Sequence, residues 1–160
     1  MNKKTNVKVV AINAMIACVY AVLTMAIQPF AYGAIQARIS EIMVFLAFYN
    51  RKYIPGLVVG CFISNIPSTI GVPDLIFGTF STLCVCLVMY YVKNIYLAAL
   101  AGGVITGIIV GGELYFVLGL PFIINAFYVF VGEAIVLLIG ALLFKMLEKN
   151  QSFMEKYIYE

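Results

Sequence analysis

The sequence lacks histidine and tryptophan altogether, and only 11% of its 160 residues carry a charge. The absence of histidine removes the side chain that most often serves as a general base or metal ligand near neutral pH. No Gly-Lys dipeptide occurs, which excludes the phosphate-binding loop of ATPases, and no Gly-x-Ser-x-Gly motif marks a nucleophile. We therefore expect a protein that is not an enzyme and has no cofactor.

The chain is also poor in cysteine motifs. Its four cysteines lie within apolar runs, and no two of them form a Cys-x-x-Cys pair: Cys18, Cys61, Cys84 and Cys86. Cysteines of this kind act as small apolar side chains, so we expect neither a metal site nor disulfide bonds. The net charge of +3 is small, and the placement of the charges argues against a nucleic-acid partner.

Apolar residues are what the sequence has in abundance. They make up 64% of the chain, and the mean hydropathy of +1.07 is typical of an integral membrane protein. The period-two alternation of membrane β-barrels is absent, which leaves helices as the spanning elements. We predict one all-α domain over residues 1–160, a bundle of six transmembrane helices in the lipid bilayer: 7–28, 35–50, 54–70, 73–92, 95–118 and 122–147.

The positive charges predict how these spans are oriented, because cytoplasmic loops carry an excess of lysine and arginine. A cytoplasmic N-terminus puts nine cations on the cytoplasmic side: Lys3, Lys4, Lys8, Arg51, Lys52, Lys93, Lys145, Lys149 and Lys156. Only Arg38 then falls on the outer side. We therefore predict cytoplasmic N- and C-termini and a multi-pass protein of a bacterial cell membrane. The basic N-terminus is expected to be retained as the start of the first helix and not cleaved as a signal peptide.

The most polar stretch of the chain lies at the start of the second predicted span. Gln36, Arg38 and Glu41 occupy its first turns, at the depth of the outer leaflet. Lipid penalises charges at that depth by several kcal/mol, so these side chains are expected to face protein or a wet cavity.

Further polar residues fall in the outer half or at the centre of the other spans: Asn65, Asp74, Glu113, Tyr115, Asn125 and Glu133. The inner half of the bundle contains no acidic residue. This asymmetry predicts a substrate-binding cavity that opens outward and is closed toward the cytoplasm.

Each acidic residue also has a simpler explanation. Asp74 follows a proline at a helix start, where a carboxylate is stabilised by the helix N-terminus whether or not it contacts a ligand. Arg38 and Glu41 are three residues apart and could pair with each other. Glu113 could be solvated near the water line. Glu133 is harder to explain, because a carboxylate at the midplane needs a donor partner or a proton.

The uncharged polar residues have alternatives as well. Asn65 and Asn125 are equally compatible with hydrogen bonds between helices. Tyr115 fits the belt of aromatic residues at a membrane interface.

Small residues recur every four positions on two helices. Gly103, Gly107 and Gly111 form a small-xxx-small stripe, which predicts close packing within the chain. Ala17 and Ala21 form a similar pair on the first helix. That pair is compatible with internal packing and also with an external partner helix.

Several sequence blocks resemble the QueT family, whose members are substrate-binding S components of energy-coupling factor (ECF) transporters. The resemblance covers nearly the whole chain: G-A-I-Q-A-R-I-S-E at 33–41, Pro55-Gly56-Leu57 with Gly60-Cys61 and Asn65, G-V-P-D-L-I-F-G-T at 71–79, Gly112-Glu113-Leu114-Tyr115 with Pro121-Phe122, and Gly132-Glu133. It implies import of a queuosine precursor, a 7-deazaguanine base such as preQ0, preQ1 or queuine. It also implies partners, namely a membrane coupling protein that contacts the first helix at Ala17 and Ala21, and two cytoplasmic ATPases. Asn13, four residues before Ala17, departs from the small-residue motif of that contact.

A 7-deazaguanine fits the polar residues chemically. Its N1–H and exocyclic amine form a pair of donors that one carboxylate can accept, and its carbonyl can accept from arginine or asparagine. We hypothesise that Glu41 or Glu133 binds the donor edge and that Arg38 supports it. Aromatic side chains could wall such a flat ring: Tyr32, Phe77, Tyr115, Phe122 and Tyr128.

Three other functions remain open at this stage. The chain could be an S component for another vitamin-like heterocycle. It could be a stand-alone transporter driven by protons or sodium, with Glu133 as the titrating carboxylate, although no inverted repeat is visible. It could also be a membrane scaffold whose polar residues only hold helices together.

Overall fold

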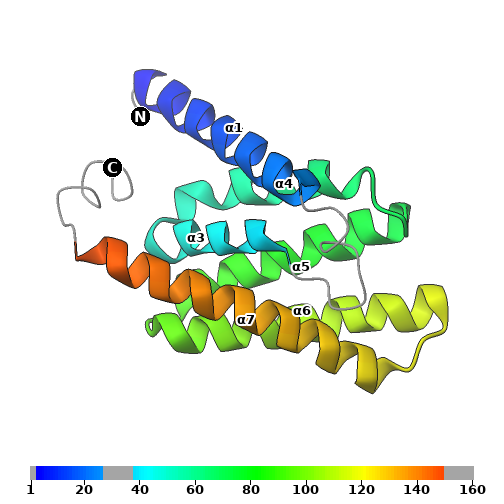
Figure 1. Cartoon of the computed structure of the whole chain (residues 1–160). Coiled ribbons are helices and arrows are strands. Elements are labelled where there is room, and N and C mark those ends of the chain that lie inside the picture. The colour runs from blue at the N-terminus through cyan, green and yellow to red at the C-terminus, as the bar shows by residue number, and fades with distance from the viewer. Residues whose placement is uncertain (1–2, 27–37, 150–160) are drawn as a thin grey trace.

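The part of the chain that the structure describes is entirely helical. The computed structural model describes residues 3–26 and 38–149. In chain order its elements, with η for 3-10 helices, are α1 (Lys3–Ala26), η1 (Ile39–Val44), α3 (Phe45–Tyr49), η2 (Arg51–Tyr53), α4 (Ile54–Asn65), α5 (Val72–Tyr91), α6 (Ile95–Leu118) and α7 (Phe122–Glu148). Most of them run side by side as a bundle (Figure 1). The predicted all-α class is confirmed.

Four helices are long and apolar enough to cross a membrane, namely Val7–Ala26 within α1, and α5, α6 and α7. The two remaining predicted spans correspond to shorter segments. The 12 residues of α4 extend about 18 Å, less than the roughly 30 Å hydrocarbon core, and η1 with α3 covers only Ile39–Tyr49. The prediction of a helix to residue 70 is wrong, because α4 ends at Asn65, just before Pro67 removes a backbone donor.

The ends of the long helices follow local sequence signals. Pro73 lies in the first turn of α5, and Pro121 directly precedes α7, as predicted. The side-chain oxygen of Asn94 accepts two backbone amides of the first turn of α6, at 3.0 and 3.3 Å. Gly119 ends α6 with a φ of 68°, a left-handed conformation that favours glycine.

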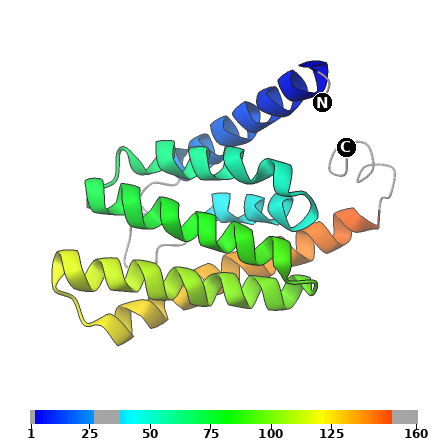
Figure 2. The same ribbon diagram turned by 180° about the vertical axis from the view of Figure 1, so that it is seen from behind.

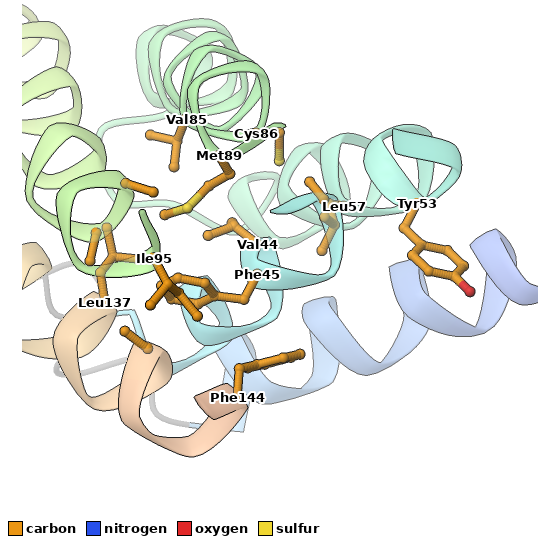
Figure 3. Packing of buried hydrophobic residues seen from close by; sticks show 14 of the residues in the cluster. Val44, Phe45, Tyr53, Leu57, Val85, Cys86, Met89, Ile95, Leu137 and Phe144 are labelled. Atoms are coloured by element: carbon orange, nitrogen blue, oxygen red, sulfur yellow. The ribbon is translucent and has the colours of Figure 1, made fainter. Parts of the chain in front are cut away.

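The short segment η1–α3 lies in the middle of the bundle, between α4, α5 and α7 (Figure 1). Val44 and Phe45 are fully buried at the centre of the largest apolar cluster (Figure 3). Side chains from the surrounding helices pack around them: Leu57, Val85, Met89, Ile95, Leu137 and Phe144. Because lipid tails are as apolar as these side chains, the cluster is stabilised by close packing more than by exclusion of water.

Helix α1 packs against α4 with its C-terminal half, while its N-terminal half extends away from the other helices (Figures 1 and 2). Ala17 and Ala21 lie on the packed side, with exposed fractions of 5% and 6%. A Cβ atom at Gly60 of α4 would lie 3.0 Å from the Cα atom of Ala17, so the two backbones are in close contact. Contrary to the predicted partner contact, this alanine pair is covered by the chain itself and not open to an external helix.

The glycine stripe of α6 packs within the chain, as predicted. A Cβ atom added at Gly103 would lie 3.2 Å from the Cβ of Ala134. One added at Gly107 would lie 2.8 Å from the carbonyl oxygen of Ala126, and one added at Gly111 would lie 2.7 Å from the Cα of Ala126. Each of these approaches is tight enough that a side chain would push α6 and α7 apart.

Adjacent glycines in α6 provide a matched test of this packing. Gly111→Ala is expected to lower the free energy of unfolding by about 1–3 kcal/mol, because the new methyl group collides with Ala126. Gly112→Ala adds the same methyl group where nothing lies within 4 Å, so it should leave stability unchanged or raise it by about 0.5–1 kcal/mol. Thermal unfolding of both variants in detergent measures the difference, and equal unfolding temperatures would contradict the close helix contact.

Apart from Arg38, the basic residues of the described chain lie at one end of the bundle. Figure 1 shows the N-terminal end of α1, the C-terminal end of α7 and the α3–α4 and α5–α6 connections on the same side. Lys93 and Lys145 line one polar pocket together with Tyr49. The side-chain amide of Asn13 in α1 donates to the backbone carbonyl of Lys52 at 2.9 Å. This grouping agrees with the charge pattern from which the orientation was predicted.

Candidate functional site

Buried polar side chains from the long helices α1, α5, α6 and α7, and from the shorter segments η1–α3 and α4, meet inside the bundle. We define the polar cluster as Tyr20, Arg38, Glu41, Cys61, Asn65, Asp74, Thr82, Glu113 and Glu133, all of them buried. The end of α4, the start of α5 and the end of α6 bring Asn65, Asp74 and Glu113 to the end of the bundle opposite Lys93. Glu133 lies about 16 Å along α7, near its middle.

An ion pair between η1 and α5 is the core of this cluster. The Nη2 atom of Arg38 lies 3.1 Å from Oδ1 of Asp74, and the two side chains are 6% and 0% exposed. The other carboxylate oxygen of Asp74 accepts the hydroxyl of Ser68. Gly78 leaves room for the pair, because a Cβ atom there would lie 3.3 Å from Nη1 of Arg38. Asp74 therefore does not cap α5, whose N-cap is Gly71.

Asn65 joins α4 to α5 beside the ion pair. Its Nδ2 atom donates to the backbone carbonyl of Asp74 at 3.2 Å, which confirms the interhelical hydrogen bond considered from the sequence. The Oδ1 atom of Asn65 has no hydrogen-bond partner within the described chain.

Glu41 is held by hydroxyl groups and not by Arg38. The carbonyl of Arg38 accepts the backbone amide of Glu41 at 2.9 Å, so both side chains start from one turn at the beginning of η1. The Oε1 atom of Glu41 accepts the phenol of Tyr20 and, at 3.0 Å, the hydroxyl of Thr82. Its Oε2 atom is buried and has no partner among the described residues.

The Thr82 hydroxyl also lies 3.1 Å from the sulfur of Cys61, which fills the space between Thr82 and Arg38. Cys61 is therefore a packing residue within the cluster, in agreement with its predicted role.

Two further carboxylates have buried oxygens without partners among the described residues. Glu113 is 0% exposed and neither of its oxygens has a hydrogen-bond partner in the described part of the chain. Glu133 is 1% exposed, and its Oε1 atom is equally unpaired there. A buried carboxylate is costly unless it binds a proton or a donor. Each of these groups therefore needs a proton or a donor that the described residues do not supply.

A small cavity of about 10 Å³ lies within the polar cluster. Its walls come from Arg38, Glu41, Gly78, Ser81, Thr82, Thr106, Val110 and Glu133. Glu41 and Glu133, each of which carries a buried oxygen without a partner among the described residues, thus line one cavity with Arg38. Its volume holds about one water molecule, so the site is closed in this conformation.

Two predicted site residues lie outside the polar cluster. Asn125 donates its side-chain amide to the carbonyl of Pro121 at 2.7 Å, a bond within the first turn of α7 and not between helices. Tyr115 is 50% exposed and stacks edge-on against Phe116, so the interfacial alternative describes it better. Gln36 lies outside the described residues.

None of the predicted wall aromatics among the described residues lines the cavity. Tyr115 and Phe122 line a separate apolar pocket of about 800 Å³ at the α6–α7 connection, and Tyr128 is 50% exposed. Phe77 is half-buried and absent from the cavity wall, while Tyr32 lies outside the described residues. The aromatic residue that does reach the cluster is Tyr20.

The sequence contained signals for some residues that the prediction missed. Asp74, Gly78 and Thr82 are spaced four residues apart, so they share one face of α5. Tyr20 and Thr24 have the same spacing on α1, and both are fully buried. Helical spacing from the predicted Asp74 would have found Gly78 and Thr82, whereas on α1 the only such signal is the spacing of Tyr20 and Thr24 from each other.

The sequence model of the QueT transporter family matches residues 10–149. The chain belongs to the QueT transporter family. The match includes the whole polar cluster, from Tyr20 to Glu133. It confirms the resemblance stated from the sequence, and it confirms that this QueT protein is a transporter and not an enzyme.

Among known proteins, this QueT chain is similar to the "Queuosine precursor transporter QueT" of Lactococcus lactis subsp. cremoris (strain MG1363). The two are 44% identical over 85 residues, which are 52% of this chain and 49% of that relative. The match therefore spans about half the length of the relative. No solved structure matches the chain.

Proposed function

We propose that this protein is the substrate-binding S component of an ECF transporter and that its polar cluster binds a 7-deazaguanine queuosine precursor. Membership of the QueT transporter family and the name of the Lactococcus relative support a queuosine precursor as the cargo. The observation that carries the assignment of the site is the pair of unpaired carboxylate oxygens, on Glu41 and Glu133, that share one cavity with Arg38.

The proposed recognition follows from the donor pattern of the ligand. Glu41 or Glu133 accepts N1–H and the exocyclic amine of the guanine-like edge, a bidentate contact of a charged acceptor with two donors. Arg38 donates to the neighbouring carbonyl oxygen while it remains paired with Asp74. The ligand would thereby satisfy buried oxygens that have no partner among the described residues.

The cavity must widen for this ligand to enter. Small-molecule sites are typically about 300–1,000 Å³, far more than the roughly 10 Å³ found here. Glu41 lies in η1 and Arg38 directly precedes it, so we infer that binding moves this segment relative to α5 and α7. A 3-10 stretch that interrupts a helical span often marks such a hinge.

We also propose that the six helical segments are inserted with both chain termini in the cytoplasm. The grouping of basic residues at one end of the bundle supports this orientation. In this arrangement η1–α3 and α4 are each too short to cross the hydrocarbon core alone. Residues of the adjoining connections would complete each span. The polar cluster would then face the outer side, in a bacterial plasma membrane.

The proposed partners are a membrane coupling protein and two cytoplasmic ATPases, because the chain contains no phosphate-binding loop of its own. Since Ala17 and Ala21 are buried, the coupling protein would contact parts of α1 that the other helices leave exposed. Exposed apolar residues lie on its projecting N-terminal half and on the side away from Ala17: Val7, Val10, Ala14, Met15 and Val22.

A thermal-shift screen tests the proposed cargo. The purified chain in detergent is heated with 7-deazaguanines and, as controls, with unrelated vitamins such as thiamine and riboflavin. A 7-deazaguanine at a hundred times its dissociation constant should stabilise the fold by about 2.7 kcal/mol, whereas the controls should have no effect. Stabilisation by another vitamin alone would make the chain an S component for that compound. Uptake by the chain alone, driven by a proton or sodium gradient, would contradict the ECF assignment.

A further inference from the structure

The polar cluster contains more acidic than basic groups. Four of its side chains are carboxylates, and Arg38 is its one cation. Arg38 is already paired with Asp74 at 3.1 Å, so its charge is offset before any ligand binds. Glu41, Glu113 and Glu133 are left without a positively charged partner among the described residues. A neutral 7-deazaguanine can satisfy one of these carboxylates with its donor edge, but not all of them.

The acidic groups lie at two depths along the bundle. Glu41 and Glu133 line the cavity together with Arg38. Asp74, at the start of α5, and Glu113, near the end of α6, lie toward one end of the bundle. Glu113 follows Val110 of the cavity wall by three residues on α6, so the two side chains share a face of that helix. Arg38 is therefore flanked by one acidic pair at the cavity and another toward the end of α6.

A 7-deazaguanine has its polar groups in a matching order. The N1–H and exocyclic amine lie on one side of the carbonyl oxygen, and the substituent at C7 lies on the other side. If Arg38 donates to the carbonyl and the Glu41–Glu133 pair accepts the donor edge, the C7 substituent points toward the Asp74–Glu113 pair. Both oxygens of Asp74 already accept hydrogen bonds, whereas both oxygens of Glu113 are unpaired among the described residues.

We propose that Glu113 binds a protonated amine carried at C7 of the ligand, so that the protein selects cationic, amine-bearing 7-deazaguanines over neutral ones. This inference rests on the proposed function, because it assumes a 7-deazaguanine in the polar cluster. A primary amine on an aliphatic carbon is protonated near neutral pH. Its ammonium supplies three donors and a positive charge to a buried carboxylate that would otherwise have to bind a proton.

The test compares two ligands that differ only in this group. The affinities of 7-aminomethyl-7-deazaguanine, which is cationic, and 7-cyano-7-deazaguanine, which is neutral, are measured by calorimetry on the full chain in detergent. The wild type is expected to bind the aminomethyl compound at least about tenfold more tightly. Glu113→Gln should remove that preference, so that the two affinities become about equal. Glu113→Asp, which keeps the charge, should retain part of the preference.

Glu148→Gln is the matched control, because Glu148 pairs with Lys145 at 2.8 Å at the basic end, far from the cluster. This variant should keep the wild-type preference in full. An equal preference in the wild type and in Glu113→Gln, or tighter binding of the cyano compound by the wild type, would overturn the role of Glu113 and leave the proposed cargo intact. Binding of neither compound would overturn the proposed cargo and the role of Glu113 together. If Glu113→Gln does not fold, a reduced preference in Glu113→Asp decides in favour, and its full retention against.

Discussion

Arg38→Met is expected to lower the free energy of unfolding by about 3–5 kcal/mol and to abolish binding of a 7-deazaguanine. The substitution removes one partner of a buried ion pair and leaves Asp74, which is 0% exposed, with a carboxylate that only Ser68 still contacts. It also removes the donor that we assign to the carbonyl of the ligand. Unfolding in detergent and calorimetric binding measure the two effects separately.

Two further variants separate the charge effect from a general loss of packing. Arg51→Met changes an exposed arginine at the basic end and should alter neither stability nor binding. The double variant Arg38→Met/Asp74→Asn removes both charges of the pair and should recover much of the lost stability while binding stays absent. The ion pair is not the central element of the site if Arg38→Met behaves like Arg51→Met.

Glu41→Gln is expected to weaken binding of a 7-deazaguanine by about 10- to 100-fold, the range of a lost hydrogen-bond contact to a charged group. Glutamine has nearly the same shape and keeps one oxygen to accept the hydroxyls of Tyr20 and Thr82. Its amide group, however, replaces an acceptor with a donor at the position of Oε2, which is unpaired among the described residues and would face the donors of the ligand. Calorimetry with a neutral 7-deazaguanine provides the measurement.

Glu133→Gln is measured together with Glu41→Gln, because either carboxylate could accept the donor edge of the ligand. The thermal stability of Glu41→Gln should stay close to that of the wild type, which distinguishes lost recognition from lost folding. Wild-type affinity in both variants would contradict the assignment of the guanine-like edge to these two residues.

Much of the fold could be predicted because the boundaries of the helices depend on local chemistry. The predicted 95–118 coincides with α6, whose ends are marked by the cap of Asn94 and the left-handed Gly119. The predicted 73–92 differs from α5 by one residue at each end, and 122–147 differs from α7 by one residue at its C-terminal end, since Pro73 and Pro121 mark where these helices begin. Proline and glycine act through their own backbone, so their effects can be read without knowledge of the neighbouring helices.

The rotation of each helix could not be predicted with the same success. In a soluble helix the apolar face marks the core, but in a membrane both the core and the lipid side are apolar. Asn125 and Tyr115 have the same polar character as Asn65, yet only Asn65 is fully buried. The sequence therefore indicated the depth of these residues in the bundle but not the side of the helix on which they lie.

The short segment between Ile39 and Tyr49 was also beyond prediction. Its composition fits a spanning helix, but its first half forms a 3-10 helix that positions Glu41 toward Tyr20 of α1 and Thr82 of α5. These contacts join residues 21 and 41 positions apart in the chain. Such long-range hydrogen bonds are set by tertiary packing, which overrides local propensity.

The central claim is that the polar cluster is a single binding site for a guanine-like base. The most direct measurement is an experimental structure of the full chain with 7-deazaguanine bound. Our account predicts the ring between η1, α5 and α7, in a cavity wider than the present one of about 10 Å³. The donor edge should lie within hydrogen-bond distance of Glu41 or Glu133, and the carbonyl within that distance of Arg38. A ring found elsewhere, such as the apolar pocket beside Tyr115 and Phe122, with the polar cluster still closed, would contradict it.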